Sequence, residues 1–188
     1  HANSWYVRAV RAFSDLDRQI TIPAGQTSAT LTITGTDDAI DEPDETIILT
    51  PTASGAVLAS SAALNIAFTD NDLPPVVSSI TATTADGAYK EGQAIAITVT
   101  FDKAVTVTGT PQLTLETGSS DAVVDYASGT GTTTLTFNYT IASGQNSDDL
   151  DYVATTSLAL NSGTITETEG TSDVTLTLPS PGATNSLG

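Results

Sequence analysis

The 188-residue chain has no cysteine and no methionine, and its only histidine is His1. Without cysteine, disulfides, thiol nucleophiles and zinc sites with thiolate ligands are all excluded. A single imidazole at the first position gives histidine-based acid–base chemistry and Ser/His/Asp systems no credible centre. We therefore expect no enzymatic activity from this chain.

Positive charge and aromatic side chains are also scarce. Five Lys and Arg residues stand against 22 Asp and Glu residues, which gives a formal net charge of -17. Nucleic acids and anionic lipid surfaces repel such a chain, so neither is an expected partner. Paired carboxylates could supply the acid and base of a glycoside hydrolase. One Trp, five Tyr and four Phe, however, leave little aromatic surface on which a sugar could stack.

Long apolar runs are absent as well. No stretch approaches the roughly 18 apolar residues that a membrane helix needs, so we expect no membrane insertion. What the chain has instead is threonine, 35 residues of it, and apolar residues that alternate with polar ones. Both features favour strands with one buried face, and no comparable helical periodicity occurs. The predicted fold class is all-β.

The alternation predicts strands on both sides of a proline pair, Pro74 and Pro75. Prolines break strand pairing and stiffen a chain, so the pair predicts a boundary between two domains. The predicted segments are 1–17, whose origin the sequence does not show, then a domain over 18–73 and a domain over 74–188. The predicted strands are 5–13, 20–22, 31–33, 46–50, 64–68, 76–83, 95–101, 105–107, 113–115, 124–126, 135–141 and 174–178.

Two acidic clusters follow apolar alternating runs. Residues 37–45 read D-D-A-I-D-E-P-D-E, with six carboxylates in nine residues, and residues 69–75 read T-D-N-D-L-P-P. Carboxylates this close repel one another unless a cation lies among them, and oxygen ligands in a flexible loop suit Ca²⁺. The clusters therefore predict calcium binding, and the alternative interpretation is a pair of solvated acidic turns.

The first domain contains the run I-T-I-P-A-G-Q-T-S-A-T-L-T-I-T-G-T-D-D-A-I-D-E-P-D-E-T, followed by I-A-F-T-D-N-D. Over residues 18–72 it resembles the second half of a Calx-beta domain, the calcium-binding sandwich of sodium/calcium exchangers and many bacterial surface proteins. The family's opening strands have no counterpart before Ile20, so we expect this domain to be incomplete. The resemblance implies Ca²⁺ at one tip of the sandwich, with the ligands Asp37, Asp38, Glu42, Glu45, Asp70 and Asp72.

The second domain contains I-T-V-T-F-D-K-A-V-T-V-T-G-T-P-Q-L-T-L, G-T-T-T-L-T-F-N-Y-T and D-D-L-D-Y. It is similar to the immunoglobulin-like repeats found in tandem in large bacterial adhesins of the RTX and biofilm-associated type. Two smaller acidic groups lie here, and for these a turn cap and a solvated strand face are the favoured interpretations over calcium binding. The groups are Asp148, Asp149 and Asp151, and Glu167, Glu169 and Asp173.

Together these resemblances imply two tandem β-sandwich domains in an extracellular protein, secreted or held at the cell surface. The expected function is a calcium-stiffened extender module of a bacterial adhesin, whose partners are neighbouring β-sandwich modules of the same polypeptide. One alternative is a calcium-dependent carbohydrate-binding module that recognises surface glycans. Another is a subunit of an extracellular filament, in which like subunits complete one another's sheets by strand complementation.

Overall fold

The computed structural model describes residues 5–6, 33–34, 37–50, 62–170 and 172–188. These residues form an all-β protein, and no helix occurs among them. Consequently none of them lies in a helix long and apolar enough to cross a membrane.

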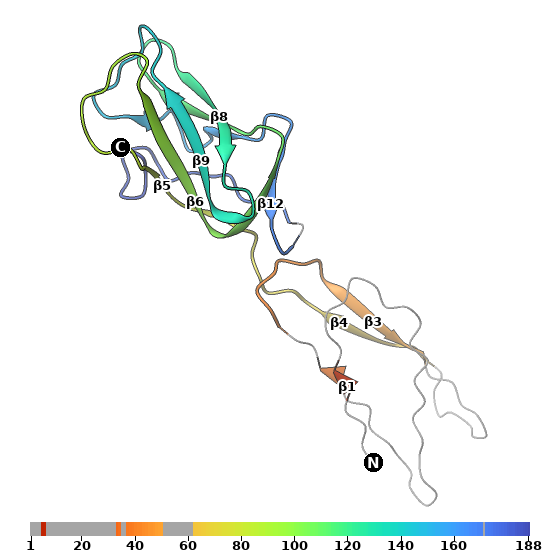
Figure 1. Cartoon of the computed structure of the whole chain (residues 1–188). Coiled ribbons are helices and arrows are strands. Elements are labelled where there is room, and N and C mark those ends of the chain that lie inside the picture. The colour runs from red at the N-terminus through yellow and green to blue at the C-terminus, as the bar shows by residue number, and fades with distance from the viewer. Residues whose placement is uncertain (1–4, 7–32, 35–36, 51–61, 171) are drawn as a thin grey trace, which may run out of the picture. The chain divides into compact units, whose positions relative to one another are not determined.

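The chain divides into two compact units (Figure 1). Unit 1 comprises His1–Ala39 and Pro43–Asp70, and unit 2 comprises Ile40–Glu42 and Asn71–Gly188. The division after Asp70 lies close to the boundary predicted at residues 73 and 74. The segment Ile40–Glu42, from the middle of the acidic run, groups with unit 2, which the sequence did not indicate.

Unit 1 contains two described pairs of strands. Strand β1 (Trp5–Tyr6) pairs in parallel with β2 (Ile33–Thr34). Strand β3 (Glu45–Leu49) pairs antiparallel with β4 (Leu64–Phe68). Alternation predicted β4 with these bounds and β3 one residue further along. The remaining parts of the strands predicted within residues 5–33 lie outside the described residues.

Unit 2 contains the larger sheet system. Its strands are β5 (Val77–Ala82), β6 (Ala94–Thr108), β7 (Gln112–Glu116), β8 (Ala122–Ser128), β9 (Thr132–Thr140), β10 (Asp151–Tyr152), β11 (Leu158–Ala159) and β12 (Thr164–Glu167). The order is β10-β7-β8-β9-β6-β12, with β5 added on β6 and β11 on β7, and these pairings are antiparallel.

Strand β6 is a single strand where alternation predicted two, 95–101 and 105–107. Its first part pairs with β5 and β9, and its last part pairs with β12. The register against β9 shifts between Thr100 and Val105, so the strand bends there without ending. The polar pair Asp102 and Lys103, which interrupts the apolar alternation, lies at this shift.

The two ends of β8 belong to different layers. Residues Ala122–Asp125 pair with β7, whereas Tyr126 and Ser128 pair with Phe137 and Thr136 of β9. One layer is therefore β7 with β10, β11 and the start of β8, and the other is β5, β6, β9 and β12 with the end of β8 (Figure 1). This arrangement is sandwich-like. Before Tyr126 on β8 and after Phe137 on β9, the two strands no longer pair with each other. We call the space between 121–125 and 138–142 the β8–β9 fork.

The core lies between these layers. All the buried hydrophobic side chains among the described residues belong to unit 2, and those of β7 and β9 include Leu113, Leu115, Leu135 and Phe137, each with 0% exposure. Burial of one such side chain stabilises a fold by about 1.5–3 kcal/mol. Burial of these side chains therefore explains why unit 2 is stably folded.

The strand predicted over 174–178 is not a regular strand. Val174 and Leu178 are buried as alternation predicts, but only isolated bridges form, including a parallel one between Val76 and Thr175. The reason lies in the backbone partners. Thr175 donates its N–H to Pro75, whereas Leu178 donates its N–H to Thr155, so no continuous ladder develops.

Candidate functional site

The six predicted calcium ligands are distributed over both units. Asp37 and Asp38 are exposed, whereas Glu45, the first residue of β3, is half-buried. Four ligands lie in unit 1, namely Asp37, Asp38, Glu45 and Asp70. The other two, Glu42 and Asp72, lie in unit 2.

The two acidic clusters were predicted to supply ligands at one tip of the domain, and parts of both come together at one end of the β3–β4 pair. Because Glu45 lies opposite Phe68, the residues before β3 and after β4 meet there. Asp44 Oδ1 accepts a hydrogen bond from the N–H of Asp70 at 3.0 Å. The C-terminal part of the acidic run thus contacts the start of the D-N-D segment. Sequence reasoning missed Asp44, which the strand register could have identified.

A complete calcium site is not formed in the described geometry. Ca²⁺ takes six to eight oxygen ligands. Across residues 37–50, 62–170 and 172–188, no group of three or more Asp, Glu, His or Cys side chains is placed to hold a metal ion. The residues present supply suitable oxygens, but their side chains would have to move toward an ion to coordinate it.

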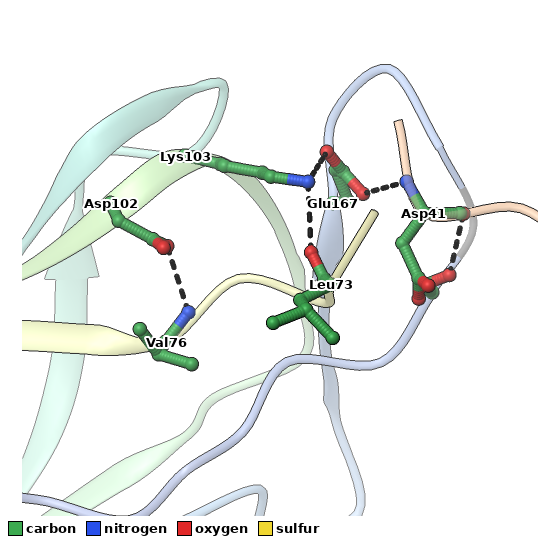
Figure 2. A network of polar contacts seen from close by, with 7 residues as sticks. Asp41, Leu73, Val76, Asp102, Lys103 and Glu167 are labelled. Carbon is green, nitrogen blue, oxygen red and sulfur yellow. Dashed lines mark hydrogen bonds and ion pairs between the residues drawn. The ribbon is translucent and has the colours of Figure 1, made fainter. Parts of the chain in front are cut away.

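A second polar cluster lies around Lys103 in unit 2 (Figure 2). Lys103 Nζ lies 3.3 Å from Glu167 Oε1 and donates to the carbonyl oxygen of Leu73 at 2.8 Å. Glu167 is only 5% exposed, so the prediction of a solvated strand face was wrong for this residue. The physical reason is the alternation of side chains along a strand, in which residues two positions apart lie on the same face. Glu167 follows buried Ile165 by two positions on β12 and therefore also points inward.

The other carboxylate oxygen of Glu167 bonds to Asp41 of the acidic run. Glu167 Oε2 accepts the N–H of Asp41 at 3.3 Å (Figure 2). Ser172 Oγ donates to the carbonyl oxygen of Asp41 at 2.9 Å. A Cβ at Gly170 would lie 3.1 Å from Glu167 Oε2, so glycine suits this close approach. Within unit 2, Asp41 is thus bound through its backbone.

Asp102, the neighbour of Lys103, holds the chain just after the proline pair. Its Oδ1 accepts the N–H of Val76 at 2.8 Å (Figure 2). Its own N–H donates to the carbonyl oxygen of Val76 at 3.1 Å. Two consecutive residues at the bend of β6 therefore bind both sides of Pro74–Pro75. This explains why the bend carries a carboxylate and an ammonium in place of apolar residues.

Two tyrosines of unit 2 are structural. Burial, followed by the negative charge of Asp151, raises the pKa of Tyr152 to about 12, and the Tyr152 hydroxyl donates to Pro179 at 2.7 Å. Burial also raises the pKa of Tyr139, whose hydroxyl donates to Gln145 Oε1 at 3.0 Å. Neither ring presents a face to a ligand, because both residues are buried.

In the acidic group of Asp148, Asp149 and Asp151, the side chain of Asp151 bonds to backbone groups. Asp151 Oδ1 accepts the N–H of Tyr152, and its Oδ2 accepts the N–H of Gly182, each at 2.8 Å. The carboxylate therefore fixes the C-terminal segment against β10.

Comparison of the chain with protein-family models, with curated proteins and with solved structures gives no match. The resemblances of residues 18–72 to a Calx-beta domain and of residues 74–188 to an immunoglobulin-like repeat therefore remain predictions. The function of the chain has to be inferred from its own contacts and charges.

Proposed function

We propose that the chain is a calcium-stiffened extender module of a secreted or cell-surface bacterial adhesin, built from two tandem β-sandwich domains. Its role is to hold a binding tip away from the cell, and its partners are neighbouring modules of the same polypeptide. One observation carries this proposal. Six carboxylates lie within residues 37–45, and Asp44 of that run contacts Asp70 at one end of the β3–β4 pair.

The energetics of such a cluster favour a bound cation. Two unit charges 4 Å apart repel by about 1 kcal/mol even in bulk water, and by more near a protein surface. Calcium sites of extracellular modules bind with dissociation constants of about 10⁻⁴–10⁻³ M, so millimolar calcium outside the cell fills them. The ion would draw in the predicted ligands, which are Asp37, Asp38, Glu42, Glu45, Asp70 and Asp72.

Calcium titration of the whole chain tests the proposal. At ten times the dissociation constant, binding stabilises the folded state by about 1.4 kcal/mol, which raises the melting temperature of a unit of this size by roughly 5–10 °C. Calorimetry of the whole chain follows the melting of both units. We expect chelation to lower the melting of unit 1 more than that of unit 2.

Matched substitutions separate the site from general charge effects. Asp38→Asn with Asp70→Asn should remove most of the calcium-induced shift. Asp86→Asn with Glu91→Gln removes the same charge from exposed positions outside the acidic groups and should leave the shift intact. Equal shifts in the two units, or no heat of calcium binding by the unaltered chain, would count against the calcium proposal.

A filament subunit is the second candidate, and one observation favours it. Among the described residues, β3 and β4 pair only with each other, and Ile48 and Leu64 on them are 63% and 58% exposed. A two-stranded sheet is marginal alone, so a neighbour's strand could extend it. Light scattering that shows concentration-dependent oligomers would support this role, and a monomer at all concentrations would exclude it.

A further inference from the structure

The β8–β9 fork of unit 2 contains a groove of about 530 Å³. Residues Asp121–Ala127 of β8 and its approach line it, together with Asn138–Thr140 of β9, Ala142 and Gln145. Its volume is within the range of about 300–1,000 Å³ typical of ligand-binding sites. The role of an extender module makes no use of this groove.

One wall of the groove is a strand edge of β8. Tyr126 donates its N–H to Pro111, immediately before β7, at 2.8 Å. Backbone groups alternate in direction along an antiparallel strand, so the N–H and C=O of Val123 point away from β7 and into the fork. Val123 is also 58% exposed. The β8 wall therefore offers hydrogen-bonding groups beside an apolar side chain.

The opposite wall is an edge of β9. Ile141 donates its N–H to Gln93, immediately before β6, at 3.0 Å. By the same alternation, the N–H and C=O of Thr140 point away from β6 and into the fork. In the part of the chain that the structure describes, the register of β8 with β9 reaches neither Val123 nor Thr140. Two strand edges that do not pair with each other thus face one groove.

The charges in the groove have one sign. Asp121 and Asp125 are exposed in its lining, and the lining contains no Lys or Arg among the described residues. Asp125 is held in place by a hydrogen bond from Gln112 Nε2 at 2.8 Å. Of the two tyrosines in the lining, Tyr139 is only 4% exposed, and Tyr126 is half-buried with its ring in an edge contact with Phe137, so the groove offers little aromatic surface to a sugar. Cationic ligands match this surface better than neutral or anionic ones.

We propose that the β8–β9 fork binds an extended, basic peptide segment of a partner protein by strand addition. The segment's main chain would pair with the edges at Val123 and Thr140, and its Lys or Arg side chains would reach Asp121 and Asp125. A second copy of this chain is a poor occupant, because each copy carries a net charge of -17. The inference goes beyond the extender role and does not depend on calcium.

Peptide binding to the whole chain in chelator tests this proposal. The probe is a fluorescent hexapeptide of alternating Lys and Val, compared with its Glu–Val counterpart and with a Lys–Val peptide N-methylated at alternate residues. We expect only the unmethylated basic peptide to bind, with amide shifts in NMR spectra at Val123, Asp125, Asn138 and Thr140. Binding of the methylated peptide with equal affinity would overturn strand addition.

Substitutions in the groove supply the second arm. Asp121→Asn with Asp125→Asn should weaken binding by roughly 2- to 30-fold, the effect of losing two exposed ion pairs. The double variant Asp86→Asn with Asp173→Asn matches the charge change outside the groove and should keep the affinity within about twofold. The proposal would be overturned if both double variants lost the same amount of affinity for the basic peptide, or if the unaltered chain did not bind that peptide. Binding of a neutral oligosaccharide in its place, or self-association through these residues, would also overturn it.

Discussion

Buried polar side chains in unit 2 keep hydrogen-bond partners. Among the described residues, no buried side-chain nitrogen or oxygen lacks a hydrogen-bond partner. Glu167 illustrates this, since both its carboxylate oxygens are engaged, by Lys103 and by the N–H of Asp41. An unsatisfied buried polar group costs about 1–3 kcal/mol, so such residues should be sensitive to substitution.

Alkaline pH should destabilise unit 2 through Tyr152. Its folded pKa of about 12 exceeds the usual value of 10.0, so the folded state favours the neutral phenol. This contribution is fully present below pH 10 and is lost as the pH rises toward 12. Each pKa unit corresponds to about 1.4 kcal/mol, so the loss should be on the order of 2–3 kcal/mol. Urea unfolding at a series of pH values measures it.

Tyr152→Phe is the control for that titration. The variant lacks the hydrogen bond to Pro179, so it should be less stable at pH 7 by about 1 kcal/mol. Its stability should, however, fall less steeply than that of the unaltered chain between pH 10 and 12. The same alkaline slope in both proteins would mean that another group titrates.

Lys103 should stabilise unit 2 mainly by neutralising Glu167. Lys103→Met leaves a nearly buried carboxylate without its cation. Complete burial would make this loss cost about 3–5 kcal/mol, and because the Lys103 side chain is 25% exposed we expect about 2 kcal/mol. Adding Glu167→Gln to this variant should recover part of the loss. A urea-unfolding double-mutant cycle without coupling between the two positions would contradict this account.

At the scale of elements, the β8–β9 hairpin depends on one glycine in its loop. Gly129 has a φ of 113°, and a Cβ there would lie 2.1 Å from the carbonyl oxygen of Thr134. Gly131 in the same loop has a φ of 80° with open space around it. Gly129→Ala should therefore cost at least about 3 kcal/mol, and Gly131→Ala only about 1–2 kcal/mol. If urea unfolding showed similar losses of stability for Gly129→Ala and Gly131→Ala, the predicted clash at Gly129 would be refuted.

Elements long enough to show alternation could be predicted from the sequence. Strand β4 has its predicted bounds, because five residues with one half-buried face repeat the period-two signal. Strands β10 and β11 have two residues each and carry no such signal. The continuity of β6 depends on which neighbour pairs with each half, and the irregular course of 174–178 depends on distant carbonyl groups. Such tertiary partners are not encoded in local alternation.

The candidate site shows the same limit. The acidic runs were evident in the sequence, and the contact between Asp44 and Asp70 follows from the pairing of β3 with β4. The assignment of Ile40–Glu42 to unit 2 depends on buried Glu167, more than a hundred residues away. The inward position of Glu167 could have been predicted from Ile165, two residues earlier on the same strand. The position of Asp41 beside Glu167 could not have been predicted from the sequence.

At the scale of the whole molecule, the net charge of -17 should make stability depend on ionic strength. Salt shortens the screening length from about 30 Å at 0.01 M to about 3 Å at 1 M and so weakens self-repulsion. Raising NaCl from about 10 mM to about 500 mM should stabilise the fold by about 1 kcal/mol, or roughly 2–4 °C in melting temperature. Calorimetry checks this, and KCl should act equally. A fall in melting temperature would contradict it.

The parallel bridge between Val76 and Thr175 has a consequence for a chain under tension. A force applied through Pro74 at one end of unit 2 and through its C-terminal segment at the other would slide the two bridged segments past each other. The hydrogen bonds from Thr175 to Pro75 and from Ile80 to Asn185 would then be loaded in shear, together and not one after another. Unit 2 would resist stretching along its length better than peeling from one edge.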